Sequence, residues 1–327
     1  MASLQGRFVT ALLSLVLAAG VSPRASAWGN EGHQTVGAVA DTLIAGTNAE
    51  VQVRTLLVAG ESLSKVSLWA DCAKGYCGPL RPEMLGFVNA NPRHHSYHFT
   101  DVPFQVDQYV AGAVGTDPDD VVQILRQAIN VLRGQTDAAS NPHGFTKRQA
   151  LLLLAHMVGD IHQPLHVGTA YVNDSDEFTV PRSQSDIDAG TIQETHGDNY
   201  LLLGSRILHS YWDGELVKRA MRRAHAATPA DYAVFLVQKY PASAAGKGDV
   251  ATWPVQWANE SLQLAKEAHD ALVLGDREEA QDRSGAPHFQ WPVTLPPGYA
   301  VRSTGEAEQQ LAKAGKRLAN VLILIWP

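Results

Sequence analysis

The chain has 327 residues, of which 45% are hydrophobic and 18% are charged, so a sizeable buried core is possible and wholesale disorder is excluded. The 33 acidic residues outnumber the 26 basic ones, and the net charge of −7 argues against a protein that holds nucleic acid by a basic surface alone. Two cysteines exclude a cysteine-rich zinc module and a dense disulfide scaffold, whereas the 13 histidines stand out.

The first predicted element is a cleaved signal peptide at residues 1–27. Arg7 gives a positive start, residues 9–21 form an apolar run, and Ala25-Ser26-Ala27 is a small-residue cleavage site. The alternative, an uncleaved membrane anchor, is disfavoured because a membrane span needs about 20 apolar residues. We therefore expect a secreted or periplasmic protein with no membrane segment, whose mature domain covers residues 28–327.

The two cysteines, Cys72 and Cys77, lie close together in the sequence. In an oxidising compartment they are expected to form one local disulfide, and two free thiols are the alternative.

Helical periodicity dominates the mature chain. Apolar residues recur at helical spacing, and capping or breaking residues mark several ends, so six helices are predicted. They cover residues 31–44, 119–132, 147–159, 205–226, 257–274 and 306–324. Strand signals are thin, and the polar, aperiodic stretch 173–196 is predicted as a long loop. Without an internal repeat or a clean linker, the sequence predicts one all-α domain, mainly helical, with long loops.

Histidine and aspartate form spaced pairs on two of these helices. His156 and Asp160 are four residues apart, so both side chains face the same way, and His209 and Asp213 repeat this spacing. A break at Pro164 would let His166 swing back toward the first pair. One such pair is most often a surface salt bridge, but two pairs and a further histidine favour a metal site inside a helical bundle.

The predicted cleavage would place Trp28 at the N-terminus, five residues before His33. A free α-amine has a pKa of roughly 7.7–8.0 and can bind a metal near neutral pH. Trp28 as a buried aromatic anchor is the alternative, and the sequence alone does not separate the two.

Six motifs occur in a fixed order along the chain. They are Trp28-Gly-x-x-Gly-His33, Trp69-Ala-Asp71, His98-Phe-Thr-Asp101, His156-x-x-Gly-Asp160-x-His-Gln-Pro-Leu-His166, Gly197-Asp198-Asn199 and His209-x-x-Trp-Asp213. In these motifs the chain resembles the secreted zinc-dependent type I nucleases, the fungal and plant family of single-strand nucleases and 3′-nucleotidases of the S-one and P-one type. That family shares a superfamily with the trinuclear-zinc phospholipases C.

The resemblance implies three zinc ions per chain, held by three sets of residues. The first set is Asp71, His98, His156 and Asp160. The second set is His166, His209 and Asp213, which leaves positions for water. The third set is Trp28, through its amine and carbonyl, His33 and a bridging Asp160.

The resemblance also implies roles around the zinc ions. Asp71 would orient or deprotonate the attacking water, and Lys74, where the family commonly has arginine, would meet the phosphate. Asn199 and Asp101 would bind the nucleotide, while Asp198 stands where many relatives have a second glycine. Nearby aromatic residues are candidates for stacking on a base, although core positions are equally expected for them: Phe87, Tyr97, Phe99 and Phe104. His94 and His95 have no counterpart in the motifs and are interpreted as loop residues.

The resemblance therefore predicts a secreted zinc-dependent endonuclease that hydrolyses RNA and DNA, preferably single-stranded, to 5′-phosphate products, with 3′-nucleotidase activity in addition. Its partners would be nucleic acids and nucleotides as substrates, and it would be a monomer with no stable protein partner. Two alternatives stand beside this prediction. A phospholipase C is disfavoured because that branch has glutamate where this chain has Asp213. A zinc-binding protein without activity is disfavoured because three protein ligands, as in the second set, are typical of catalytic zinc.

Overall fold

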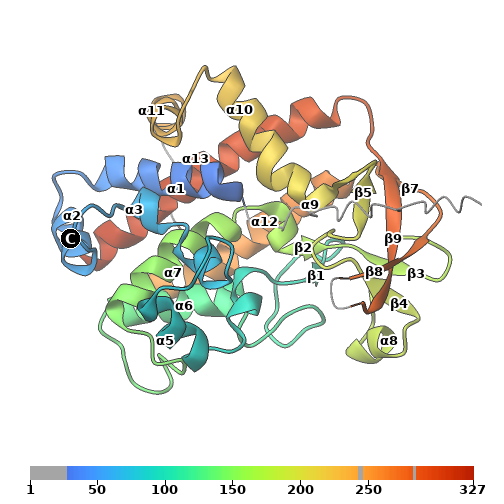
Figure 1. Cartoon of the computed structure of the whole chain (residues 1–327), viewed down its shortest axis with the longest axis horizontal. Helices are drawn as coiled ribbons and strands as arrows, with labels where there is room; N and C mark the ends of the chain where they lie inside the picture. The colour runs from blue at the N-terminus through green and yellow to red at the C-terminus, as the bar shows by residue number, and fades with distance from the viewer. Residues whose placement is uncertain (1–27, 242–245, 283–284) are drawn as a thin grey trace, which may run out of the picture.

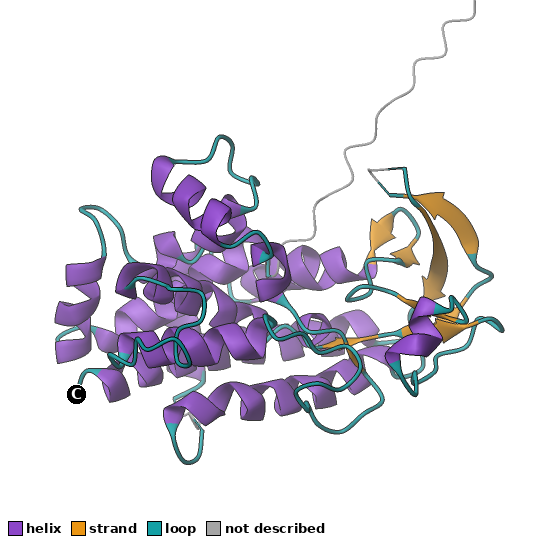
Figure 2. Ribbon diagram, turned by 90° about the horizontal axis from the view of Figure 1, so that it is seen from below, coloured by secondary structure: helices purple, strands orange, loops and turns teal. Residues whose placement is uncertain are grey.

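The structure is a computed structural model that describes residues 28–241, 246–282 and 285–327. The predicted signal peptide at 1–27 lies outside the described residues. Helices make up most of the described chain, as predicted, and the strands gather at one end of the molecule (Figures 1 and 2). The prediction of an all-α fold is correct in the main, but it misses these small sheets.

Three long helices form the centre of the helical part. They are α1 (Gly29–Ile44), α7 (Lys147–Asp160) and α13 (Tyr299–Ile325). The first helix packs against both of the others, so segments from the two ends of the chain lie side by side (Figure 1). Close approach depends on Gly315, where an added Cβ would lie 2.5 Å from Val39.

The central helix α7 follows directly from its sequence. Thr146 and Gln149 form a reciprocal capping box at its start. Every residue from Ala150 to Asp160 is buried, so this helix is surrounded on all sides. Helix α6 (Val121–Leu132) packs along it and is capped by the buried carboxylate of Asp120. Two polar residues, His156 and Asp160, therefore lie in the middle of the hydrophobic core.

The remaining helices are short or peripheral. They are α2 (Asn48–Leu56), α3 (Leu63–Val66), α4 (Trp69–Ala73), α5 (Pro82–Ala90), η1 (His94–His98), η2 (Pro164–His166), α8 (Gln184–Asp188), α9 (Leu208–Ser210), η3 (Tyr211–Leu216), α10 (Val217–Arg223), α11 (Pro229–Lys239), η4 (Val250–Thr252) and α12 (Trp253–His269).

Three small sheets complete the described fold. Strands β1 (Val102–Pro103) and β2 (Gly168–Thr169) pair in parallel, and β3 (Tyr171–Asn173) pairs with β4 (Ile192–Glu194) in antiparallel fashion. In the third sheet, the order is β6-β5-β9-β7, with β8 also paired to β9. Its strands are β5 (Leu201–Leu203), β6 (Arg206–Ile207), β7 (Val273–Leu274), β8 (Glu278–Gln281) and β9 (Pro287–Thr294).

The six predicted helices are all present, with altered ends. Those at 31–44, 119–132 and 147–159 match α1, α6 and α7 closely, whereas the last predicted helix begins earlier, at Tyr299. The helix at 205–226 is divided into α9, a π-helical segment and α10, and the one at 257–274 stops at His269. The loop at 173–196 contains α8 and β4, so that prediction is wrong in part. These two elements are too short to leave a periodic pattern in the sequence.

Two further predictions concern the covalent and membrane state. Cys72 and Cys77 are joined in a disulfide, as expected. Among the described residues, no helix is both long enough and apolar enough to cross a membrane.

Candidate metal centre

Seven elements bring eight of the nine predicted metal ligands to one buried region through their side chains. His33 lies on α1, Asp71 on α4, His98 at the end of η1, His156 and Asp160 on α7, His166 on η2, His209 on α9 and Asp213 in η3. Each of these residues is at most 4% exposed. Burial of so many ionisable groups together is costly unless partners or a cation compensate them.

The first set converges on one oxygen of Asp160. Its Oδ2 lies 3.0 Å from His98 Nδ1 and 3.2 Å from His156 Nε2, and these two nitrogens are 3.0 Å apart. Asp71 Oδ1 lies 3.8 Å from both nitrogens. The ligand atoms of His98, His156 and Asp160 therefore lie at spacings close to the roughly 3.3 Å edge of a tetrahedral zinc site with Zn–N bonds of about 2.0–2.1 Å, and Asp71 Oδ1 lies next to the two nitrogens.

The protonation of His156 decides what its other nitrogen offers. Its Nδ1 lies 2.5 Å from the carbonyl oxygen of Ser67, which can only accept a hydrogen bond, so Nδ1 carries the proton. The Nε2 of the neutral ring is then a lone pair aimed at the carboxylates. Such an arrangement is repulsive without a cation and is the usual orientation of a metal-binding histidine.

The second set shows the same arrangement more clearly. His166 Nδ1 lies 2.8 Å from the carbonyl oxygen of His98, and His209 Nδ1 lies 2.5 Å from that of Gly197. Both Nδ1 atoms therefore donate, and the two Nε2 lone pairs face each other at 3.0 Å. Asp213 Oδ2 lies 3.3 Å from His209 Nε2, while its other oxygen accepts from Gln163.

The third set uses the other oxygen of Asp160. His33 Nε2 lies 3.2 Å from Asp160 Oδ1, and neither atom makes a hydrogen bond. The two carboxylate oxygens of Asp160 thus face different histidines, which suits the bridging role that the sequence predicts. His33 is also within reach of Asp71 and His156 for a metal site, and its ring stacks on that of His156 at 3.8 Å.

Trp28 lies beside this third set as the N-cap of α1. It is fully buried, has a left-handed φ of 37°, and its indole donates to the carbonyl oxygen of Gly159. An added Cβ on Gly159 would lie 2.8 Å from His33 Nδ1, so glycine is required there. The indole therefore anchors Trp28 next to His33, which fits both readings of this residue.

Electrostatics differ among the imidazoles of the centre: burial would lower the pKa of His156, but the carboxylates of Asp160 and Asp71 raise it overall. Burial lowers the pKa of His98 to about 3, with Lys74 adding to the decrease, and burial together with His209 lowers the pKa of His166 to about 3. For Asp71, burial would raise the pKa, but the charges of His156, Lys74 and His98 outweigh it and hold the pKa well below its usual range.

Asp213 is different, because burial raises the pKa of this carboxyl to about 7 and the nearby carboxylates of Asp160 and Asp71 add to the increase. These imidazole and carboxylate donors are the nitrogen and oxygen ligands that zinc accepts, so the residues present fit the predicted ion.

A cavity of about 390 Å³ lies against the second set. His98, His166 and His209 form part of its wall, and the predicted substrate residues Lys74, Asp101 and Asn199 line it as well. The structure therefore places all three substrate residues beside the candidate metal ligands.

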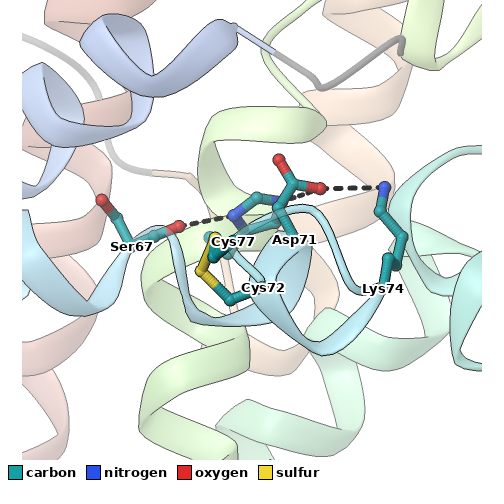
Figure 3. The surroundings of a disulfide bond; sticks show 6 residues. Ser67, Asp71, Cys72, Lys74 and Cys77 are labelled. Carbon is teal, nitrogen blue, oxygen red and sulfur yellow. Dashed lines mark hydrogen bonds and ion pairs between the residues drawn. A yellow bond between two sulfur atoms is a disulfide. The ribbon is translucent and has the colours of Figure 1, made fainter. Parts of the chain in front are cut away.

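Lys74 is held at the cavity by a small covalent ring. The disulfide between Cys72 and Cys77 closes a loop that contains Lys74, whose Nζ lies 2.8 Å from Asp71 Oδ1 (Figure 3). The same Nζ lies over the ring of Tyr76. Burial would lower the pKa of Lys74, but the carboxylate of Asp71 raises it overall, so the amino group is a cation next to the metal ligands.

A family model described as S1/P1 Nuclease matches residues 28–326. The chain belongs to the S1/P1 nuclease family. Endonuclease 2 of Arabidopsis thaliana is 31% identical over 185 residues, which cover 55% of this chain and 58% of that protein. Nuclease S1 of Aspergillus oryzae is 29% identical over 141 residues, or 42% of this chain and 44% of that protein. The chain thus spans about half the length of these two relatives, whereas Endonuclease 4 of Arabidopsis thaliana is 24% identical over 91% of this chain and 89% of its own.

Among the aromatic residues proposed from the sequence of this S1/P1 nuclease family member, only Phe99 lines the cavity. It is 36% exposed, whereas Phe87 and Tyr97 are core residues, and Phe104 stacks on His269. Sequence reasoning missed Tyr76, whose proximity to Lys74 within the disulfide loop was an available signal.

Three more polar residues near the cavity were not singled out from the sequence. His94 and His95, interpreted from the sequence as loop residues, both lie in η1, where His94 is buried and His95 lines the cavity. Glu194 and His196 lie beside Asp101 in a half-exposed cluster. Burial raises the pKa of Asp101 well above its usual value, and repulsion from Glu194 adds to the increase. No local spacing connects these residues, which come from η1, β4 and the segments after them.

Proposed function

We propose that this protein is a zinc-dependent phosphodiesterase that hydrolyses RNA and DNA, with a preference for single strands, and releases 5′-phosphate products. The observation that carries this proposal is the second set, where two imidazole lone pairs and a carboxylate oxygen converge beside a cavity. Three protein ligands next to a cavity are typical of catalytic rather than structural zinc. Family membership supports the nuclease assignment.

Three zinc ions per chain would be held by the three sets defined above, with Asp160 shared between two of them. When bound, zinc lowers the pKa of a coordinated water to about 7 and polarises phosphoryl oxygens. The negative charge of the protein as a whole is then no obstacle to an anionic substrate, since positive charge is concentrated in the cavity.

The residues of the chain have separate tasks in this proposal. Asp71 is ionised at neutral pH and lies between Lys74 and the histidines of the first set. It can therefore accept a proton from water or hold that water in line with phosphorus. Lys74 would neutralise a phosphate oxygen as a point charge, without the bidentate geometry of arginine. Asn199 and Asp101 would contact the sugar or base.

The shape and lining of the cavity support a single-stranded substrate. A base must leave its stack before its phosphodiester can reach buried ligands, and this costs less in a single strand. Phe99 and Tyr76 both line the cavity and offer aromatic faces on which a base can stack. The same cavity would admit a 3′-nucleotide, so 3′-nucleotidase activity is part of the proposal.

Export is part of the same proposal. Cleavage after Ala27 in a secreted or periplasmic protein would free the amine of Trp28 next to His33, and an oxidising compartment suits the Cys72–Cys77 disulfide. A monomer would suffice, because all the proposed ligands come from one chain.

The test uses the mature protein and matched single- and double-stranded oligonucleotides of RNA and DNA. We expect zinc-dependent cleavage that a chelator abolishes and zinc restores, with 5′-phosphate ends and the single strand cut faster. A parallel assay offers a 3′-mononucleotide and phosphatidylcholine vesicles. Oligonucleotides that stay intact with zinc present contradict the proposal, and hydrolysis of phosphatidylcholine instead would assign the protein to the phospholipase C branch.

A further inference from the structure

The turn that carries Gly197 has an unusual backbone. His196, Gly197 and Asp198 follow one another with left-handed φ values of 52°, 61° and 65°. Only glycine adopts this region readily, so two of the three residues carry a conformational cost that other contacts must offset. The turn is therefore held in place by its surroundings rather than by its own preference.

Gly197 links this turn to the second set. Its carbonyl oxygen accepts the hydrogen bond from His209 Nδ1 at 2.5 Å, which leaves His209 Nε2 as the lone pair facing His166. An added Cβ on Gly197 would lie 2.9 Å from the carbonyl oxygen of Leu165, next to His166. The position of this one carbonyl thus determines both the tautomer and the orientation of a proposed zinc ligand.

The carboxylate of Asp198 ties the turn to the strand region after His166. This side chain is fully buried, and its Oδ1 accepts from the backbone N–H of Ala170 at 3.1 Å and lies 3.0 Å from Thr195 Oγ1. Ala170 follows β2, which begins two residues after His166. Asp198 therefore fixes the segment of one histidine ligand relative to the carbonyl that orients the other.

The second oxygen of Asp198 meets a histidine from a distant part of the chain. Oδ2 lies 2.8 Å from Nε2 of His269, the last residue of α12, and both side chains are fully buried. His269 Nδ1 lies 2.7 Å from the carbonyl oxygen of Ala265, so Nδ1 carries a proton. The 2.8 Å contact between Asp198 Oδ2 and His269 Nε2 therefore joins the turn to the end of α12 inside the protein.

The ring of His269 is itself fixed. It stacks on Phe104 with centroids 3.9 Å apart and meets the edge of Phe178. Because α12 also packs against η2 and β2, the helix holds Asp198 against the segment that carries His166.

We propose that Asp198 and His269 form a positioning pair for the second metal position, acting through the Gly197 carbonyl on His209. This inference rests on the proposed function, since it assumes that His166, His209 and Asp213 hold zinc. Neither residue lines the cavity that would hold the substrate, so both are positioning residues.

The experiment measures zinc affinity in the mature protein, with zinc alone as the probe and a chromophoric chelator as competitor. Asp198→Gly and His269→Phe are expected to weaken one zinc ion by about tenfold to one-hundredfold, the usual effect of losing a partner that orients a ligand. The other two ions should keep their wild-type affinity. Asp198→Asn should restore most of the affinity, because the amide oxygen still accepts from Ala170 and the amide group donates to a neutral His269.

Glu308→Gln is the matched control. Glu308 is a buried carboxylate that accepts from Lys239 and Tyr240, away from the residues that line the cavity. Its replacement should lower thermal stability and leave all zinc affinities unchanged. Wild-type affinities in Asp198→Gly, or an equal loss for every ion, would overturn the inference. A wild-type protein that binds no zinc would instead overturn the proposed function, so the two failures are distinguishable.

Discussion

Among the described residues, polar clusters that contain buried charged side chains are of two kinds, and they differ in how hydrogen-bond donors and acceptors are matched. Between α12 and α13, Arg317 donates to both oxygens of Glu260 and to His162. Glu308 likewise accepts from Lys239 and Tyr240. In the metal centre, by contrast, carboxylate oxygens face imidazole lone pairs, and His33 and Asp160 Oδ1 have no hydrogen-bond partner.

The difference shows what each cluster is suited to do. A matched cluster neutralises itself and contributes to stability without a ligand. In a cluster of acceptors, the facing oxygen and nitrogen atoms repel one another. A bound cation removes this repulsion, so the cluster favours metal binding. The contrast predicts that equivalent substitutions in the two kinds of cluster have opposite consequences.

The largest effect is expected for Asp160→Asn. Its two carboxylate oxygens face different proposed zinc positions, so the amide should weaken two ions and lower kcat/KM by more than about a hundredfold, since loss of an orienting partner alone costs 10–100-fold. Metal content and oligonucleotide cleavage are the measurements. Asp120→Asn is the control, because Asp120 is also a fully buried carboxylate but is matched by Tyr109 and three backbone N–H groups. If Asp160→Asn keeps its full zinc content, the metal centre would not differ from the matched clusters in its need for a cation, and the prediction would be wrong.

Asp120 also supplies a pH prediction. Burial raises the pKa of this carboxyl to about 6, against 3.8 in the unfolded chain, even though hydrogen bonds act in the other direction. The folded state thus holds its proton to higher pH, and this contribution to stability is complete below about 3.8 and lost as the pH rises to 6. Relative to Asp120→Asn, the unfolding free energy of the wild type should fall by about 2 kcal/mol between pH 4 and 7.

Urea unfolding of both proteins at several pH values tests this expectation. Parallel pH curves for the two proteins would contradict it. Because Asp120 lies in a matched cluster, added zinc should leave the difference between the curves unchanged.

A smaller effect is expected at the edge of the metal centre. Lys74→Ala should raise KM for an oligonucleotide about tenfold, the size expected for one charge-assisted hydrogen bond, with less change in kcat and none in zinc content. Lys74→Arg should retain the substrate affinity, since it keeps the charge and adds bidentate geometry. A fall in zinc content in Lys74→Ala would mean that the lysine belongs to the metal centre rather than to substrate binding.

The smallest effect is expected for the paired replacement Cys72→Ser and Cys77→Ser. Opening the loop should destabilise the protein by about 2 kcal/mol and raise KM less than Lys74→Ala does, because the ion pair to Asp71 still holds the lysine. Steady-state kinetics and thermal unfolding check both parts. A KM increase as large as that of Lys74→Ala would show that the disulfide, and not the ion pair, positions the amino group.

Much of the fold was predictable where the periodic signal is long. The helices α1, α6 and α7 follow from apolar spacing and from caps such as Thr146, and the same spacing places His156 beside Asp160. The missed elements are short, and Thr228 with Asp231 shows that a capping box could have located α11. The third sheet was missed because β5 and β9 meet only in space, through Leu201 and Trp291.

Helical spacing, a local property of the chain, was enough to predict the pairs His156/Asp160 and His209/Asp213, and the family resemblance supplied the other candidate ligands. How these residues meet depends on tertiary packing. Three such contacts join separate elements of the chain. Asp160 contacts both His33 and His98, Tyr76 and His95 line the same cavity, and Asp198 contacts His269. Local spacing carries no information about such contacts, since they depend on which helices and loops pack together and at what distance.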